Sequence, residues 1–231
     1  MKRSNSAVRQ GVLAGLCLAL VVTAWPALAA KDPPQVTDDG LQLVKQTKTR
    51  LVYKKPGATF TQYKRFAILD CAVEFSKDWL RNYNSSQRDP SRRISDKDLE
   101  RAKTSLQTQF KKIFTDELTK GGYQMSDSAA PDVLVLRPAL LNIEVSAPDL
   151  MAPGRSMTFV ENSGAMTLYL ELWDSATNTL LARGMDARSS NESFGQRSSS
   201  VSNMAAAQRI MQSWASELRQ RLDLVTGKSS D

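Results

Sequence analysis

A long amphipathic segment in the middle of the chain restricts the possible folds most strongly. Ser95 is a residue type that caps helix N-termini, and the acidic residues Asp96 and Asp98 suit the positive end of a helix dipole. The pair Gly121-Gly122 provides a stop signal. The segment predicts a helix of about seven turns with one buried face. The apolar residues that recur at helical spacing are Leu99, Ala102, Leu106, Phe110, Ile113, Phe114 and Leu118.

A second segment with the same periodicity lies near the end of the chain, from Asn203 to about Val225. Two amphipathic helices each need an apolar surface to cover, so the remaining segments must supply one. The apolar face of the second helix consists of Ala207, Ile210, Met211, Trp214, Leu218 and Leu222.

Strand-like segments precede each of these helices. The strongest alternation puts one set of residues on each side of a strand: Met166, Leu168, Leu170 and Leu172 on one, and Thr167, Tyr169, Glu171 and Trp173 on the other. Residues 175–178 form a turn, and 179–188 return as the partner strand. The other predicted strands are 41–44, 50–53, 65–75, 132–137 and 139–146, with Pro138 marking a bulge or a sheet edge.

This order of elements predicts an α+β fold: a mixed, largely antiparallel sheet with the two amphipathic helices packed on one face. The other face stays partly open to solvent, which agrees with the mixed character of the Tyr169 and Trp173 side. The predicted single domain covers 41–225, after a flexible lead-in at 30–40 and before a tail at 226–231. Residues 81–93 and 189–202 are polar and are expected to form loops.

The N-terminal segment has the three parts of a cleavable signal peptide. All charges before residue 11 are positive, and Gly11–Ala24 is apolar. Small residues at Ala27 and Ala29 predict cleavage after Ala29, so residues 1–29 would be removed. The apolar run is short for a membrane-spanning helix, which needs about 20 apolar residues. The sequence therefore predicts export to the periplasm and no transmembrane segment after processing.

The two cysteines are both interpreted as unreactive. Cys17 follows Leu16 and lies inside the apolar run, whereas a lipidated cysteine closes such a run after a small residue; no lipid anchor is predicted. Cys71 would be the only cysteine left after processing and cannot form an intramolecular disulfide. Its apolar neighbours indicate a buried thiol.

The usual catalytic groups are missing from the sequence. The chain has no histidine, which removes Ser-His and Cys-His pairs and imidazole metal sites. No Ser-x-x-Lys pair and no G-x-S-x-G elbow occurs. We therefore predict no enzymatic activity, no metal and no cofactor, although a motif search does not exclude a carboxylate-based hydrolase. Removal of residues 1–29, which hold three basic and no acidic residues, would lower the formal net charge from +7 to +4. This charge is modest, and an exported protein rarely meets nucleic acid, so no nucleic-acid partner is expected.

A basic run begins after Asp39 and contains no acidic residue before Asp70. If its strands are neighbours, its charges form a patch that would bind an anionic envelope component, such as phospholipid head groups, lipopolysaccharide or cell-wall polymer. The alternative is a solvated edge strand, for which lysine is the usual protection. The residues are Lys45, Lys48, Arg50, Lys54, Lys55, Lys64 and Arg65.

The segment 147–159 connects two predicted strands but is neither short nor polar. Its apolar side chains either fold back over the core or contact a partner. The interaction candidates are Asp149, Leu150, Met151, Arg155, Met157 and Phe159 in this segment, together with Tyr169 and Trp173 on the mixed strand.

The sequence resembles a bacterial envelope family known as domain of unknown function 3313. The resemblance implies an exported envelope protein, usually a lipoprotein, with no assigned activity and no catalytic residues to transfer; this chain lacks the lipobox. The stretches that carry it are Asp39-Gly40-Leu41 with Tyr53 and Pro56-Gly57-Ala58, Ile94-Ser95-Asp96 with Gly121-Gly122-Tyr123, Pro131-Asp132-Val133 through Ala147-Pro148-Asp149 and Pro153-Gly154-Arg155-Ser156 to Gly164-Ala165-Met166-Thr167, and Trp214-Ala215 with Leu218 and Leu222.

Three functional hypotheses follow from these observations. The first is a non-enzymatic accessory or interaction protein of the envelope that binds a protein partner through 149–159 and the Tyr169/Trp173 face. The second is a module that binds an anionic lipid or cell-wall surface through the basic run. The third is a carboxylate-based hydrolase.

Overall fold

The computed structural model describes residues 32–145, 162–191 and 200–228. Pro34–Asp231 forms one unit, so residues 34–40, which the sequence assigns to a lead-in, belong with the domain. The predicted signal peptide (1–29) and the predicted interaction segment (149–159) lie outside the described residues.

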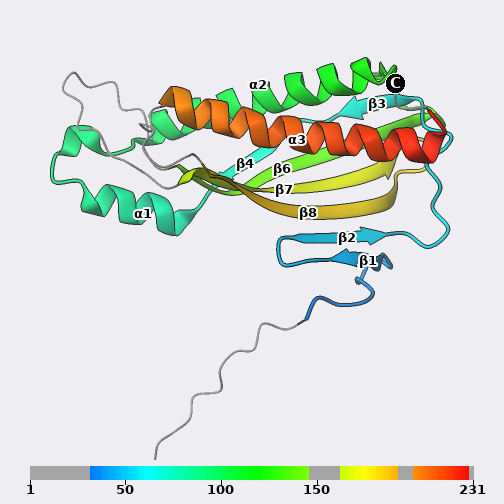
Figure 1. The fold of residues 1–231 in the computed structure, drawn as a ribbon, viewed down its shortest axis with the longest axis horizontal. Coiled ribbons are helices and arrows are strands. Elements are labelled where there is room, and N and C mark those ends of the chain that lie inside the picture. The colour runs from blue at the N-terminus through cyan, green and yellow to red at the C-terminus, as the bar shows by residue number, and fades with distance from the viewer. Residues whose placement is uncertain (1–31, 146–161, 192–199, 229–231) are drawn as a thin grey trace, which may run out of the picture. The chain divides into compact units, whose positions relative to one another are not determined.

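The described strands form one eight-stranded sheet in the order β1-β2-β8-β7-β6-β3-β5, with β4 also paired to β6. The pairs β3–β5, β3–β6 and β4–β6 are parallel and the others are antiparallel. The long meander β6-β7-β8 forms the centre of the sheet (Figure 1). The strands are β1 Gln42–Gln46, β2 Arg50–Lys54, β3 Arg65–Ile68, β4 Ala72–Phe75, β5 Gln124–Met125, β6 Val133–Val145, β7 Asn162–Asp174 and β8 Thr179–Asn191.

Two long helices, α2 (Asp96–Lys120) and α3 (Ser200–Thr226), lie side by side on one face of this sheet (Figure 1). Helix α2 begins with a capping box: the Ser95 hydroxyl accepts from the Asp98 backbone N–H, and the Asp98 carboxylate accepts from the Ser95 N–H. Both helices and the mostly antiparallel mixed sheet confirm the predicted α+β fold.

The first helix, α1 (Lys77–Ser86), shows that the loop predicted over 81–93 is wrong in its first part. The Ser76 hydroxyl caps this helix by accepting from the Trp79 backbone N–H at 3.3 Å. The rings of Phe75, Trp79 and Tyr83 stack along it with centroids 5.8 and 6.1 Å apart. The only apolar or aromatic residues of α1 are Trp79, Leu80 and Tyr83, which is too few for a clear helical period.

The single strand predicted over 65–75 is two strands, because β3 and β4 are separated by three residues. Both pair in parallel with β6: β3 pairs as far as Leu136, and β4 begins at Ala139. Pro138 lies opposite the break. A proline has no N–H to donate to a neighbouring strand, so the neighbour is interrupted there while β6 itself continues.

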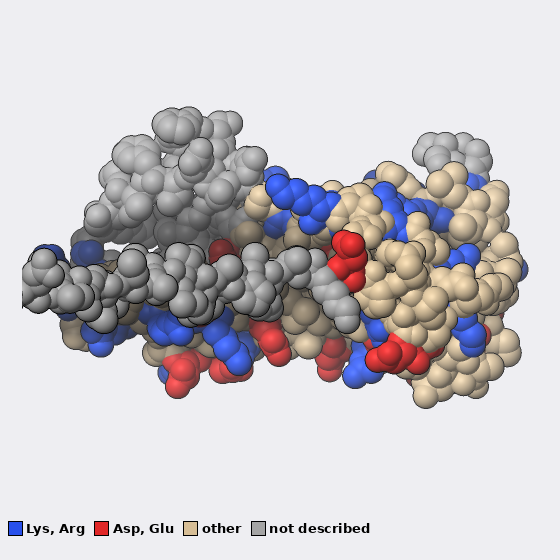
Figure 2. Space-filling model, turned by 90° about the horizontal axis from the view of Figure 1, so that it is seen from below, with Lys and Arg blue, Asp and Glu red and all other residues tan. Residues whose placement is uncertain are grey.

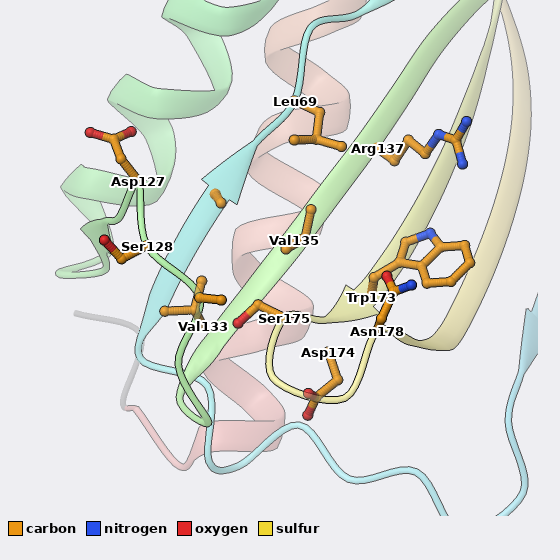
Figure 3. Close-up of a pocket in the computed structure, with 12 residues that line it drawn as sticks. Leu69, Asp127, Ser128, Val133, Val135, Arg137, Trp173, Asp174, Ser175 and Asn178 are labelled. Carbon is orange, nitrogen blue, oxygen red and sulfur yellow. The ribbon is translucent and has the colours of Figure 1, made fainter.

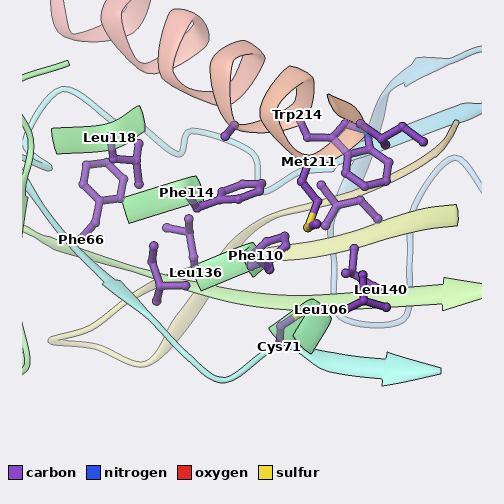
Figure 4. Packing of buried hydrophobic residues seen from close by; sticks show 14 of the residues in the cluster. Phe66, Cys71, Leu106, Phe110, Phe114, Leu118, Leu136, Leu140, Met211 and Trp214 are labelled. Carbon is purple, nitrogen blue, oxygen red and sulfur yellow. The ribbon is translucent and has the colours of Figure 1, made fainter. Parts of the chain in front are cut away.

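The hydrophobic core lies between the helices and the sheet (Figure 4). Phe110 and Phe114 of α2 stack with ring centroids 4.0 Å apart, and both are fully buried. Met211 and Trp214 of α3 pack into the same cluster. Cys71 is also buried there, which confirms its interpretation, and burial raises the pKa of its thiol to about 12.

A buried polar cluster joins α2 to α3. Arg219 of α3 donates to Glu117 of α2 at 2.8 Å and to Asp223 at 2.7 Å. The Tyr123 hydroxyl donates to Asp223 at 2.9 Å. Gln208 of α3 donates to Gln109 of α2 at 3.0 Å, so residue numbers rise together along the two helices, and α2 and α3 run parallel (Figure 1).

A second ionic cluster attaches the β1–β2 hairpin to α3. The Arg50 guanidinium of β2 donates to Asp186 of β8 at 2.6 Å and also pairs with Glu217 of α3. Arg188 donates to Glu217 at 2.8 Å, and the Trp214 indole N–H donates to Asp186 at 2.8 Å. This cluster links a sheet edge, the central sheet and a helix.

Acid should weaken this junction. Hydrogen bonding from Arg50 lowers the pKa of Glu217 from 4.5 to about 2, so the unfolded chain takes up that proton at higher pH than the folded one. The stabilisation is therefore complete above about pH 4.5 and is lost as the pH falls towards 2. Urea unfolding across this range should show Glu217→Gln losing less stability on acidification than the parent. Glu74→Gln, at an exposed position of β4, is the control, and equal acid slopes in both variants would contradict the assignment.

Candidate functional site

The sheet face opposite α2 and α3, which we call the open face, carries Tyr169, Glu171 and Trp173 of β7. Glu171 is paired with Arg183 of β8, and paired residues in an antiparallel ladder point to the same side. Asp186, three positions after Arg183, points to the other side and bonds to Trp214 of α3. No described helix packs across the open face.

Glu171 is the centre of a hydrogen-bond cluster on the open face, and only 6% of it is exposed. Its carboxylate accepts from the Tyr169 hydroxyl at 2.5 Å, the Trp173 indole N–H at 3.0 Å and the Arg183 Nε–H at 3.2 Å. Arg183 in turn pairs with Asp39, from the turn that precedes β1. The cluster therefore fixes both predicted interaction residues, Tyr169 and Trp173, in place.

The protonation states in this cluster are set by burial and by the same hydrogen bonds. Burial alone would raise the pKa of Glu171, but the hydrogen bonds from Tyr169, Trp173 and Arg183 lower it below its ordinary value. Burial and the bond to Glu171 raise the pKa of Tyr169 to about 12. At neutral pH the carboxylate stays ionised and the phenol stays protonated, so neither is suited to exchange protons with a substrate.

Beside this cluster lies an open pocket of about 540 Å³ (Figure 3). Val133 and Val135 form its floor, the Trp173 ring forms one wall, and Leu69 lies at its edge (Figure 3). Ala67, which is paired with Val135, also lines it. The rim is polar and consists of Arg137, Asp127, Ser128, Asp174, Ser175 and Asn178. We call this the Trp173 pocket.

The rim on the turn side is held in place by its own hydrogen bonds. Asp174 accepts from the Tyr63 hydroxyl at 2.6 Å and from the backbone N–H groups of Ala176 and Thr177 at 2.9 and 2.8 Å. Asn178 has a positive φ of 49°, a conformation that asparagine tolerates in tight turns. The β7–β8 turn therefore forms a fixed edge of the pocket.

The predicted basic run does not form a single patch. Lys45, Lys48, Lys54 and Lys55 lie on or beside the β1–β2 hairpin, whereas Lys64 and Arg65 lie at β3. Strands β8, β7 and β6 separate β2 from β3, so the run is divided between two parts of the sheet. Arg50 and Arg65 are also neutralised by ion pairs. In Figure 2 acidic side chains lie among the basic ones.

Of the predicted interaction residues, the structure brings Tyr169 and Trp173 together on the open face, whereas the six in 149–159 lie outside the described residues. Sequence reasoning missed Glu171, Arg137 and Leu69. An acidic residue between two aromatic ones on the same side of a strand was the available signal for Glu171. Nothing in the local sequence placed Leu69 beside β7, because that contact depends on the strand order.

The described residues offer little for catalysis. Every described carboxyl group with a resolved shift has a lowered pKa, whereas a general acid needs a raised one. Within the described ranges no cluster of three or more metal-binding side chains occurs. None of the described helices is long and apolar enough to span a bilayer.

Comparison with known proteins places the chain in a family. The family described as "Protein of unknown function (DUF3313)" matches residues 35–218. The chain belongs to this family. The match confirms the resemblance seen in the sequence and assigns no activity to the DUF3313 domain.

Two solved structures show distant similarity to this DUF3313 protein. A PelC dodecamer subunit from Paraburkholderia phytofirmans is 12% identical with a TM-score of 0.37, covering 75% of this chain and 96% of that one. A minor lipoprotein from Acinetobacter baumannii is 11% identical with a TM-score of 0.32, covering 72% and 95%. No curated protein matched the chain.

Replacing Glu171 with glutamine should destabilise the domain. Glutamine removes the charge that compensates Arg183 and accepts fewer hydrogen bonds, which should cost about 1–3 kcal/mol in the free energy of unfolding. Urea denaturation measures this loss, and the indole N–H resonance of Trp173 should shift in the variant. Glu144→Gln, at an exposed position on β6, is the control. A parent-like stability for Glu171→Gln would mean that the cluster is not formed.

Proposed function

We propose that this DUF3313 domain is a non-catalytic binding module of the bacterial cell envelope that holds a protein partner on its open face. The observation that carries the proposal is the Trp173 pocket, where a half-buried aromatic side chain lines an open pocket beside apolar residues on a sheet face that no described helix covers. Aromatic side chains in such positions are the usual anchors of protein interfaces.

The rigidity of the site supports this function. Trp173 donates its N–H to the buried Glu171, and the adjoining turn is fixed by Asp174. A pre-ordered surface loses less conformational entropy on binding than a flexible one does. The surface is therefore suited to recognition, and the cluster that fixes it is not suited to proton transfer.

The envelope location is part of the proposal. It is supported by the positively charged, apolar and small-residue parts of the N-terminal segment, which together are typical of an export signal.

Site-specific photocrosslinking in living cells tests the binding function. A benzoylphenylalanine placed at Leu69, which is 47% exposed at the pocket edge, should give one discrete crosslinked product that mass spectrometry can identify. The matched control is the same residue at Leu224, which is 78% exposed on α3 and should give no such product.

A second variant shows whether the product depends on the pocket. In the protein that carries benzoylphenylalanine at position 69, the additional change Trp173→Ala should abolish the crosslink. A thermal melt of this purified variant should confirm that it still folds. No product from position 69, or the same product from positions 69 and 224, would overturn the proposal.

A further inference from the structure

We infer that the Trp173 pocket binds a peptide segment that inserts an apolar side chain and presents a carboxylate to Arg137. The inference deepens the proposed function, on which it rests, by naming the chemistry of the partner. The pocket has a volume of about 540 Å³, which is the size of a small-molecule site. A stable protein interface is larger and buries about 800 Å² of surface on each partner. The pocket is thus an anchor point inside a larger contact.

The apolar half of the pocket defines the inserted group. Val135 of β6 is paired with Ala67 of β3 and with Trp173 of β7, and these residues line the pocket together with Leu69. The Trp173 N–H is already donated to Glu171. What the ring offers a ligand is therefore its apolar surface, which matches an aliphatic or aromatic side chain.

Arg137 defines the charged group. Its side chain is 64% exposed, and among the described residues its only ion-pair partner is Glu171, at 3.9 Å. That distance is too long for a hydrogen bond, and Glu171 already accepts from Tyr169, Trp173 and Arg183. The guanidinium fork of Arg137 is thus available at the pocket rim, and its geometry matches a carboxylate.

The rest of the rim favours a peptide over a lipid surface. Asp127 and Asp174 would repel an anionic bilayer or a clustered anionic head group. The Asp127 carboxylate and the Ser128 and Asn178 side chains can accept hydrogen bonds from peptide N–H groups. Among the described residues that line the pocket, Arg137 is thus the single cation on a rim of hydrogen-bond acceptors. This arrangement suits a peptide that brings one carboxylate and several backbone N–H donors.

Binding of small defined probes tests this inference by NMR on the isotope-labelled protein. N-acetyl-phenylalanine carries an apolar side chain and a terminal carboxylate. N-acetyl-phenylalanine amide has the same side chain but no negative charge. N-acetyl-glutamyl-phenylalanine amide carries the carboxylate on a side chain instead, which distinguishes a chain end from an internal acidic residue. Octanoate and phosphatidylglycerol vesicles represent the lipid alternative.

We expect a carboxylate-bearing probe to shift the Trp173 indole and Val135 resonances. N-acetyl-phenylalanine amide should bind the parent protein about tenfold more weakly than N-acetyl-phenylalanine does, because a charge-assisted hydrogen bond is lost. For the same reason, N-acetyl-phenylalanine should bind Arg137→Gln about tenfold more weakly than it binds the parent. Arg101→Gln, at a position with 67% side-chain exposure on α2, is the matched control and should bind like the parent.

Three results would overturn the inference. They are no shift at the pocket with either carboxylate probe, unchanged affinity in Arg137→Gln, or stronger binding of octanoate or the vesicles than of the peptides. The proposed function fails separately: if the Leu69 crosslink persists in cells while the probes do not bind, the domain has a partner and only its assigned chemistry is wrong.

Discussion

The packing of two parallel helices on one face of the sheet is the constraint on which the rest of the structure depends. The phenylalanines of α2 and the Met211 and Trp214 side chains of α3 fill the space against the central strands. Arg219 links Glu117 to Asp223 and fixes one helix against the other. Because both helices lie on one side, the opposite side of β6, β7 and β8 must be stabilised by its own residues.

The open face is stabilised by electrostatics where no helix covers it. Glu171 is nearly as buried as a core residue, yet it is ionised and accepts from three side chains on the same face. A buried carboxylate is tolerated only when it is compensated in this way. The compensation holds Trp173 in one orientation, so the interaction that stabilises the face also forms the wall of the pocket.

Periodicity predicted those elements whose signal is local. The capping residue Ser95, the glycine stop of α2 and the alternation along β7 each depend on neighbouring residues only, and the structure has them where the sequence indicated. Helix α1 was not predicted because only Trp79, Leu80 and Tyr83 supply an apolar face within its ten residues. The division of the basic run depends on the insertion of β8, β7 and β6 between β2 and β3, which no local pattern reveals. Tyr169 and Trp173 could be found from alternation, whereas Arg137 and Leu69 reach the site only through strand order.

Hydroxyl-radical footprinting of the full chain tests the central claim most directly, because it compares two tryptophans in one protein. Trp214 of α3 is buried in the hydrophobic core, whereas Trp173 lines the open pocket. In the purified protein we expect Trp173 to oxidise much faster than Trp214, and in intact cells, where the partner is present, its rate should fall while that of Trp214 stays unchanged. Equal protection of both residues in the purified protein would contradict the account, because the face described as open would then be covered.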